Sequence, residues 1–272
     1  MSVARGSVTG ASVTRVSVTR VSVEPSRRCK KACAFCYNGS HADGDGEWTA
    51  DELAAFGRDL AAHGVEAISI GGGEPLEWDG LFDALEALDG VLARSLTTNG
   101  LGLDAGALDR LARARPDKVH VSIHDPRARG EVRRAIDAVR ALDARAIPSG
   151  VNLLVARSRL DAARAAARAL AAAGIERERV VFLPMRGHDT PSPAEVAALA
   201  SGPFQSMTCL RGCGPSPRFA SVAPDRTAAW CSYTRTRRRL DALTYAALAR
   251  ALDGLGLAPC DGGALVRLGA AP

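Results

Sequence analysis

The feature that most constrains the fold of this 272-residue chain is a strict alternation of strand-like and helix-like segments. A short apolar or alternating run is followed by a segment of helical periodicity, and this occurs six times. The expected strands are residues 19–24, 65–71, 93–100, 117–125, 149–157 and 177–185, and the expected helices are residues 49–64, 78–92, 104–115, 129–145, 158–174 and 192–200.

A helix between successive strands forces parallel pairing through right-handed crossovers. The sheet should therefore carry helices on one face and curl towards a barrel. Eight such units close a full barrel, so six should leave it open at the side. The expected fold class is α/β, a partial (β/α)6 barrel with parallel strands. Ligands in such folds bind at the carboxyl ends of the strands.

Two of the expected helices have a clear start. Thr49 with Glu52, and Ser192 with Glu195, have the spacing of a capping box. In this arrangement each side chain accepts a hydrogen bond from the other residue's backbone N–H group.

The composition changes after residue 190, where proline, glycine and cysteine become frequent. A hairpin is expected around Pro224 and Asp225, followed by one more helix over residues 240–255. The expected organisation is a flexible N-terminal tail (residues 1–16), a barrel (residues 17–190) and a small C-terminal appendage of hairpin and helix (residues 191–272).

The charge of the chain indicates the kind of ligand it binds, and its apolar runs indicate its compartment. The net charge is +5, and the arginines are interspersed with acidic residues. This pattern suits an anionic small molecule or an acidic peptide, and nucleic acid is not an expected partner. No run is apolar enough for a signal peptide or a membrane span, so a cytoplasmic protein is expected.

In a reducing compartment the seven cysteines are expected to be metal ligands or buried thiols.

Three of these cysteines, Cys29, Cys33 and Cys36, directly follow the first expected strand. They should therefore lie at the carboxyl end of the sheet. Thiolates are soft ligands that suit zinc or an iron–sulfur cluster, and a structural zinc site would need a fourth ligand, for which His41 is the nearby candidate. A four-iron cluster held by three cysteines would instead keep one iron open for a non-protein ligand.

The stretch "CKKACAFCY" resembles the C-x3-C-x-aromatic-C signature of the radical S-adenosylmethionine (SAM) superfamily. The resemblance implies that Cys29, Cys33 and Cys36 hold a [4Fe–4S] cluster whose open iron binds SAM. One electron from such a cluster cleaves SAM to a 5′-deoxyadenosyl radical. Phe35, in the aromatic position, would lie along the adenine.

Other stretches at strand ends resemble the SAM-binding motifs of the same superfamily. "SIGGGEP" resembles the G-G-E-P motif, which implies that Gly72, Gly73 and Glu74 hold the methionine ammonium group. On its own, such a stretch is also compatible with a tight turn and a solvated glutamate.

The third, fourth and fifth expected strands also end in polar residues. The resemblance implies that Thr98 and Ser122 hold the methionine carboxylate or the ribose, and that Asn152 contacts the ribose. Residues 98–100 are also typical of a plain turn. His124 is a candidate catalytic proton-transfer group, and a histidine in such a place more often has a structural hydrogen-bonding role.

The C-terminal appendage resembles the twitch module, a shortened SPASM domain that carries an auxiliary iron–sulfur cluster. The resemblance implies metal ligation by Cys209, Cys213 and Cys231, with Cys260 as a fourth ligand, a catalytic hydrogen-atom donor or an inert thiol. A zinc site is the alternative. The sequence departs from the module at Arg226, where a glycine is usual, and in the closer spacing of its first two cysteines.

The leading hypothesis is a radical SAM enzyme that abstracts hydrogen from a peptide or a small metabolite. Its expected cofactors are the [4Fe–4S] cluster and SAM, and an auxiliary [4Fe–4S] cluster is a further candidate. Its expected electron donor is a flavodoxin or a ferredoxin. The alternative is a non-catalytic iron–sulfur or zinc protein that serves in electron transfer or as a scaffold.

Overall fold

The computed structural model describes residues 17–187, 189–205, 207–214, 216–258, 260 and 266–267. The expected N-terminal tail, residues 1–16, lies outside these ranges.

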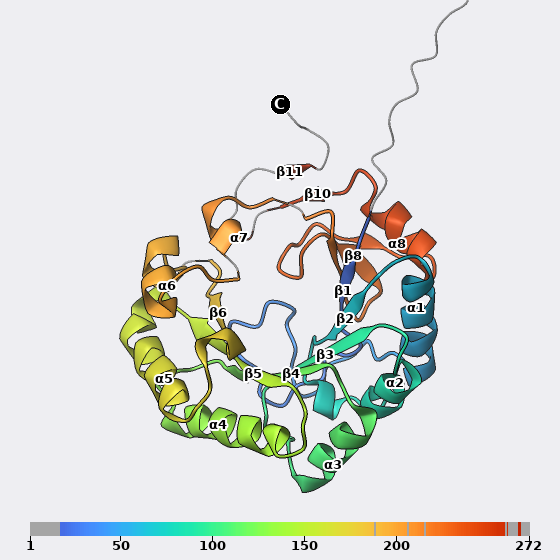
Figure 1. Cartoon of the computed structure of the whole chain (residues 1–272). Coiled ribbons are helices and arrows are strands. Elements are labelled where there is room, and N and C mark those ends of the chain that lie inside the picture. The colour runs from blue at the N-terminus through green and yellow to red at the C-terminus, as the bar shows by residue number, and fades with distance from the viewer. Residues whose placement is uncertain are drawn as a thin grey trace, which may run out of the picture.

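Six parallel strands form the central sheet, in the order β6-β5-β4-β3-β2-β1. Each strand pairs with the next along the chain, as the alternating pattern predicts, and the sheet curls into an open barrel (Figure 1). The strands are β1 (Arg20–Val23), β2 (Ala67–Ile70), β3 (Ala93–Thr98), β4 (Lys118–Ile123), β5 (Ser149–Val155) and β6 (Val180–Pro184).

Helices surround the outside of this barrel (Figure 1). Both predicted capping boxes are present, at Thr49 with Glu52 and at Ser192 with Glu195. No helix in the described ranges is long and apolar enough to cross a membrane. The helices are α1 (Ala50–Ala62), α2 (Leu81–Ala87), α3 (Ala105–Ala114), α4 (Arg129–Asp143), α5 (Leu160–Ala172) and α6 (Pro193–Ala200), with short 3-10 turns η1 (Pro75–Glu77), η2 (Arg157–Arg159) and η3 (Arg177–Arg179).

The two faces of the sheet differ in chemistry. Alternate strand residues such as Ile68, Leu96 and Val121 are almost fully buried in the apolar core. The residues between them are small and polar: Ser22 pairs in register with Ser69 on the neighbouring strand. Because successive strand residues point to opposite faces, this alternation puts the apolar core under the helices and a polar lining inside the barrel.

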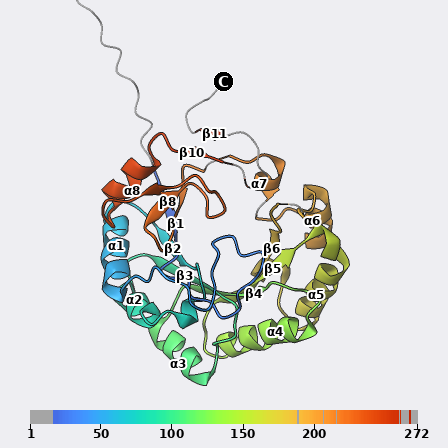
Figure 2. The ribbon, with the colours of Figure 1, turned by 180° about the vertical axis from the view of Figure 1, so that it is seen from behind.

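The C-terminal segment extends the same sheet. The predicted hairpin is present as β7 (Phe219–Val222) and β8 (Thr227–Ala229), which pair antiparallel, and β9 (Arg238–Arg239) follows. β7 pairs parallel with β1, so the appendage continues the barrel sheet instead of standing apart from it (Figure 2). The remaining elements are α7 (Met207–Arg211), α8 (Tyr245–Leu252), β10 (Gly256–Leu257) and β11 (Val266–Arg267).

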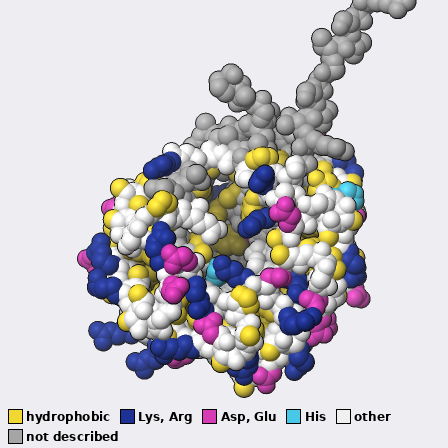
Figure 3. Space-filling view, in the orientation of Figure 1, with side chains coloured by type: hydrophobic (Ala, Val, Ile, Leu, Met, Phe, Trp, Pro, Cys, Tyr) yellow, Lys and Arg dark blue, Asp and Glu magenta, His cyan; other side chains and the backbone are white. Residues whose placement is uncertain are grey.

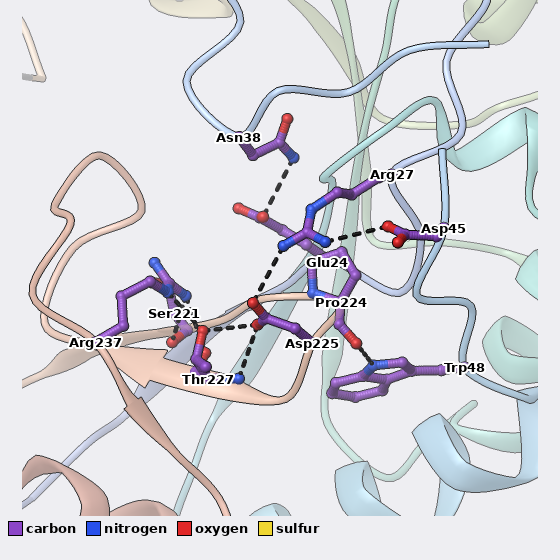
Figure 4. Close-up of polar contacts among 10 residues, drawn as sticks. All are labelled: Glu24, Arg27, Asn38, Asp45, Trp48, Ser221, Pro224, Asp225, Thr227 and Arg237. Atoms are coloured by element: carbon purple, nitrogen blue, oxygen red, sulfur yellow. Dashed lines mark hydrogen bonds and ion pairs between the residues drawn. The ribbon is translucent and has the colours of Figure 1, made fainter. Parts of the chain in front are cut away.

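Polar contacts fasten the tip of the hairpin to the segment that follows β1 (Figure 4). Arg27 lies 3.2 Å from Asp45 and 3.1 Å from Asp225, which is at the hairpin turn. The buried Trp48 indole donates to the carbonyl of Pro224 at 2.9 Å. These contacts join the hairpin turn to both ends of the cysteine segment, at Arg27 before the cysteines and at Asp45 and Trp48 after them.

Candidate functional site

A pocket of about 300 Å³ opens at the carboxyl ends of the parallel strands, where the fold class places a ligand. It is the hollow near the centre of the face in Figure 3. The cysteine segment and the C-terminal part contribute to its wall. Each of the six parallel strands contributes at least one lining residue: Ser22, Ser69, Thr97, Ser122, Asn152 and Leu183.

The cysteine loop, residues 29–36, brings all three predicted ligands to this pocket. Cys29, Cys33 and Cys36 are half-buried and line it. Backbone bonds shape the loop: the Cys29 N–H donates to the His41 carbonyl at 2.9 Å, and the Cys36 N–H donates to the Cys33 carbonyl at 2.9 Å. The His41 side chain is exposed and is not part of the pocket lining, so it supplies a backbone acceptor here.

The three thiols influence one another. Burial raises the pKa of the Cys33 thiol; nearby Lys31 lowers it, and the neighbouring Cys29 and Cys36 thiols raise it again. The Asn99 amide lies 3.8 Å from the Cys29 sulfur, within reach of a hydrogen bond to it. In the described part of the chain no three His, Cys, Asp or Glu side chains form a group positioned for a single metal ion. The fit to an iron–sulfur cluster therefore rests on three soft donors gathered at one pocket.

Phe35 lies on the cysteine loop and faces the pocket. Its side chain is 40% exposed, and its ring centroid is 6.0 Å from that of His124, at the end of β4. An apolar ring that lines a pocket and remains exposed is suited to packing against a planar ligand.

The glycine turn after β2 packs directly against the cysteine segment. The Gly73 N–H donates to the Ser26 carbonyl at 2.9 Å, and the Glu74 N–H donates to the Arg28 carbonyl at 2.8 Å. A Cβ atom on Gly73 would lie 2.2 Å from that Arg28 oxygen, and Gly72 has a φ of +95°. These glycines therefore permit close approach of the cysteine segment's backbone, which the sequence analysis did not predict.

The Glu74 carboxylate joins the β2 turn to the end of β3. It accepts hydrogen bonds from the Thr98 hydroxyl at 2.6 Å, the Asn99 N–H at 2.7 Å and the Leu76 N–H at 3.1 Å. Burial raises the pKa of Glu74, and these hydrogen bonds lower it in part. The Thr98 hydroxyl also accepts from the Gly100 N–H at 3.0 Å. Both side chains line the pocket, but much of their hydrogen-bonding capacity is already used.

Ser122 and Asn152 are neighbours in register on β4 and β5. Both are buried, at 6% and 9% exposure, and both line the pocket. A hydroxyl and an amide side by side can bind two adjacent polar groups of one ligand, such as a diol.

The pocket-lining Lys31 forms an ion pair that the sequence did not predict. Lys31, between two of the cysteines, lies 2.6 Å from Glu131 on α4, and both side chains are largely buried. The same carboxylate accepts from the His124 N–H at 2.5 Å and lies 3.6 Å from His124 Nδ1. Burial would raise the pKa of Glu131, but the hydrogen bonds from His124 and Lys31 lower it to about 2. No local motif signals this pair, because its members are far apart in the sequence.

A second group of thiols lies in the C-terminal part. Burial raises the pKa of Cys231, its hydrogen bond from the Tyr233 N–H lowers it, and the nearby Cys209 and Cys260 thiols raise it. The Cys209 and Cys260 thiols thus lie near Cys231, and metal ligation by these cysteines stays a prediction. Cys213 is half-buried against the apolar core.

The unusual Arg226 keeps the backbone conformation that a glycine would favour. Its φ is +61°, in the left-handed region, and its guanidinium pairs with Glu52 on α1. An arginine at this position is therefore compatible with the left-handed backbone of the hairpin turn.

A pair of tyrosines lies between the two thiol groups. Tyr37 follows Cys36, and its ring centroid is 4.9 Å from that of Tyr233, whose N–H donates to the Cys231 sulfur. The Tyr37 hydroxyl donates to the buried Glu24 carboxylate at 2.9 Å. This contact closes the wall of the pocket between the barrel and the hairpin.

The comparison with protein families decides the assignment that the cysteine loop and the pocket suggest. The family model of the radical SAM superfamily matches residues 23–200, more than half of the chain. This chain belongs to the radical SAM superfamily. The predicted superfamily, the α/β partial-barrel fold class, and the cofactors that the superfamily implies, a [4Fe–4S] cluster and SAM, are confirmed.

Individual relatives of this radical SAM chain have different activities. It is 37% identical over 98 residues to a probable GTP 3′,8-cyclase of Methanocella arvoryzae, covering 36% of this chain and 32% of the relative. It is 34% identical over 142 residues to a pre-heme d1 synthase of Dinoroseobacter shibae, covering 48% and 35%. The chain spans about a third to a half of the length of the curated relatives it matches.

The fold is similar to that of a solved structure, Streptococcus suis SuiB bound to its precursor peptide SuiA. The TM-score is 0.64 at 12% identity, over 79% of this chain and 60% of SuiB. At this level of identity the similarity concerns the fold.

Proposed function

We propose that this radical SAM enzyme abstracts hydrogen from a peptide or a small metabolite held in the pocket at the carboxyl ends of the strands. One observation carries the proposal: the cysteine loop, the glycine turn and the polar ends of β3, β4 and β5 all line that single pocket. A scaffold or a simple electron carrier has no need of a ligand pocket beside its thiols.

The chain's own residues divide the binding of the cofactors. Cys29, Cys33 and Cys36 would hold the cluster, and Phe35 would cover the adenine. When bound, the cluster and SAM supply one-electron cleavage of the sulfonium and a radical able to abstract hydrogen.

The strand ends would orient SAM. Gly72, Gly73 and Glu74 would bind its ammonium group, partly through backbone atoms, since the Glu74 carboxylate already accepts three hydrogen bonds. Thr98 and Ser122 would bind the carboxylate or the ribose, and Asn152 the ribose. His124, which is at the rim beside Phe35, would be the proton-transfer group.

The apolar residues at the ends of β5 and β6 would confine the substrate. Leu154, Leu183 and Met185 make that side of the pocket apolar, which would exclude water from a reactive radical. A peptide or a small metabolite is favoured because the pocket opens towards solvent, and SuiB, with the same fold, has been solved with a precursor peptide. The electron donor would be a flavodoxin or a ferredoxin.

The second thiol group would hold an auxiliary [4Fe–4S] cluster. Cys209, Cys231 and Cys260 would be ligands because the Cys209 and Cys260 thiols lie near Cys231 and thiolates are soft ligands. Cys213 remains a predicted ligand, and Cys260 is the alternative hydrogen-atom donor.

The test is anaerobic reconstitution of the wild type and of a Cys29/Cys33/Cys36→Ala variant, followed by iron and sulfide analysis and an assay for 5′-deoxyadenosine with SAM and dithionite. We expect 5′-deoxyadenosine from the wild type only, and iron remaining in the variant would report the second thiol group. A wild type that binds iron but forms no 5′-deoxyadenosine, with peptides and metabolites supplied, would contradict the proposal.

A further inference from the structure

Arg186 is a cation in the pocket wall that the proposed function leaves without a role. It follows β6 and lines the pocket together with Met185 and Tyr233. Its guanidinium carbon lies 5.5 Å from the centroid of the Tyr233 ring. Its Nε atom is buried and has no hydrogen-bond partner among the described residues.

The other charged side chains in the pocket wall already have ionic or hydrogen-bonding partners. Among the described residues, Lys31 and Arg186 are the lysine and arginine side chains that line the pocket. Lys31 pairs with Glu131 at 2.6 Å, and the Glu74 carboxylate accepts hydrogen bonds from its neighbours. Arg186 makes no ion pair within the described part of the chain. Among the described residues, Arg186 is therefore the pocket-lining cation that has no anionic side chain as a partner.

A half-buried guanidinium loses hydration, and it is stabilised when an anionic group replaces the lost water. The planar fork of arginine matches the two oxygens of a carboxylate. A single positive charge suits a single negative group. A triphosphate carries several charges and would call for several cations.

We propose that Arg186 binds a carboxylate of the substrate, with the Tyr233 ring packed beside it. The substrate is then an acidic peptide side chain or a small carboxylic acid, and it is not a nucleoside triphosphate. This inference rests on the proposed function, because it names the substrate class of the same pocket. Two other anions are alternative partners of Arg186. One is the carboxylate of SAM itself, and the other is a thiolate of the Cys231 group, which lies near Arg186.

The experiment measures binding by calorimetry to the anaerobically reconstituted full-length enzyme in the presence of SAM. The probes are N-acetyl-glutamate α-amide, its neutral counterpart N-acetyl-glutamine α-amide, butyrate and GTP. The variants are Arg186→Met, which keeps the stem and removes the charge, and Arg186→Lys, which keeps the charge and removes the fork. Arg239→Met, at an exposed position on β9, is the matched control.

We expect the wild type to bind the glutamate probe at least tenfold more tightly than the glutamine probe. Arg186→Met should reduce this preference to within twofold, Arg186→Lys should retain part of it, and Arg239→Met should leave it intact. Tighter binding of the glutamate probe than of butyrate would identify a peptide as the carboxylate's source, and the reverse would identify a small acid.

Several results would overturn the inference. Equal binding of the glutamate and glutamine probes to the wild type, or binding of neither, would do so. Loss of SAM affinity in Arg186→Met would assign the cation to SAM, and loss of iron would assign it to the second thiol group. Tight binding of GTP that depends on Arg186 would indicate a nucleotide substrate. Failure of the proposed function is seen separately, as a wild type that forms no 5′-deoxyadenosine.

Discussion

At the scale of single residues, the pocket is held by side chains that meet only in the folded chain. Lys31 lies within the cysteine loop, but its partner Glu131 is on α4, so the pair joins the loop to that helix. Breaking a buried ion pair by removing one partner leaves the other charge without compensation, which is more costly than removing both.

The ion pair gives a first prediction. Glu131→Gln should lower the free energy of unfolding by about 3 kcal/mol and weaken SAM binding, because Lys31 then has no counter-charge. Lys31→Met with Glu131→Leu should recover part of this loss. Asp161→Asn, which breaks the exposed pair with Arg164, is the control and should cost less than about 0.5 kcal/mol. Denaturant unfolding of the wild type and the three variants measures these free energies. A loss in Glu131→Gln as small as that in Asp161→Asn would show that the pair does not hold the loop.

His120 gives a prediction about pH. It lies on β4 with a buried Nε2 atom that has no partner among the described residues, and burial, helped by the nearby Lys118, lowers its pKa to about 4. The unfolded chain, with the ordinary pKa of about 6.5, then binds more protons between pH 6.5 and 4, so stability must fall as the pH falls through this window. The expected loss is up to about 3 kcal/mol.

The measurement is denaturant unfolding at pH 7, 6, 5 and 4 for the wild type and for His120→Phe. The variant keeps a ring of similar shape beside Gly150 and should lack this part of the pH dependence. Parallel pH profiles for the two proteins would contradict the assignment.

At the scale of elements, the sequence predicted the strands and helices well because their periodicity is local. Six strands, their helices, both capping boxes and the hairpin follow from short-range patterns. The local sequence pattern could not show why residue 73 must be a glycine. The carbonyl that fills the space beside it belongs to Arg28, on a segment 45 residues earlier. Ligand-binding motifs at strand ends thus also record how loops pack on one another.

This packing predicts the effect of adding one methyl group. Gly73→Ala should destabilise the fold by about 1–3 kcal/mol and displace the cysteine loop, because the new Cβ atom meets the Arg28 carbonyl oxygen at 2.2 Å. Gly71→Ala is the control, since a Cβ there has nothing within 4 Å and Gly71 does not have a positive φ. Thermal unfolding should separate the two variants by several degrees. Equal melting temperatures would mean that the loop can move away freely.

At the scale of the whole molecule, the C-terminal part belongs to the barrel. The composition change after residue 190 predicted a small C-terminal appendage, and β7 of this segment pairs with β1 along all four residues, from Arg20 with Phe219 to Val23 with Val222. The edge of a sheet that a hairpin joins is set by contacts distant in sequence, so local patterns do not determine it. Arg237 strengthens the junction through Thr227 and Ser221, close to the buried Glu24 (Figure 4).

This junction predicts that barrel and hairpin unfold as one unit. Detaching β7 from β1 would expose the edge of β1 and the buried side chains of Val21, Ala220 and Val222, so the two parts should lose their structure together. Native-state hydrogen exchange of the full chain measures this. The amides of β7 should exchange with the same opening free energy as those of β1 and β2, within about 0.5 kcal/mol. Exchange of β7 at a clearly lower free energy would mean that the hairpin opens while the barrel stays folded. The wall of the pocket that carries Tyr233 could then move independently of the cysteine loop.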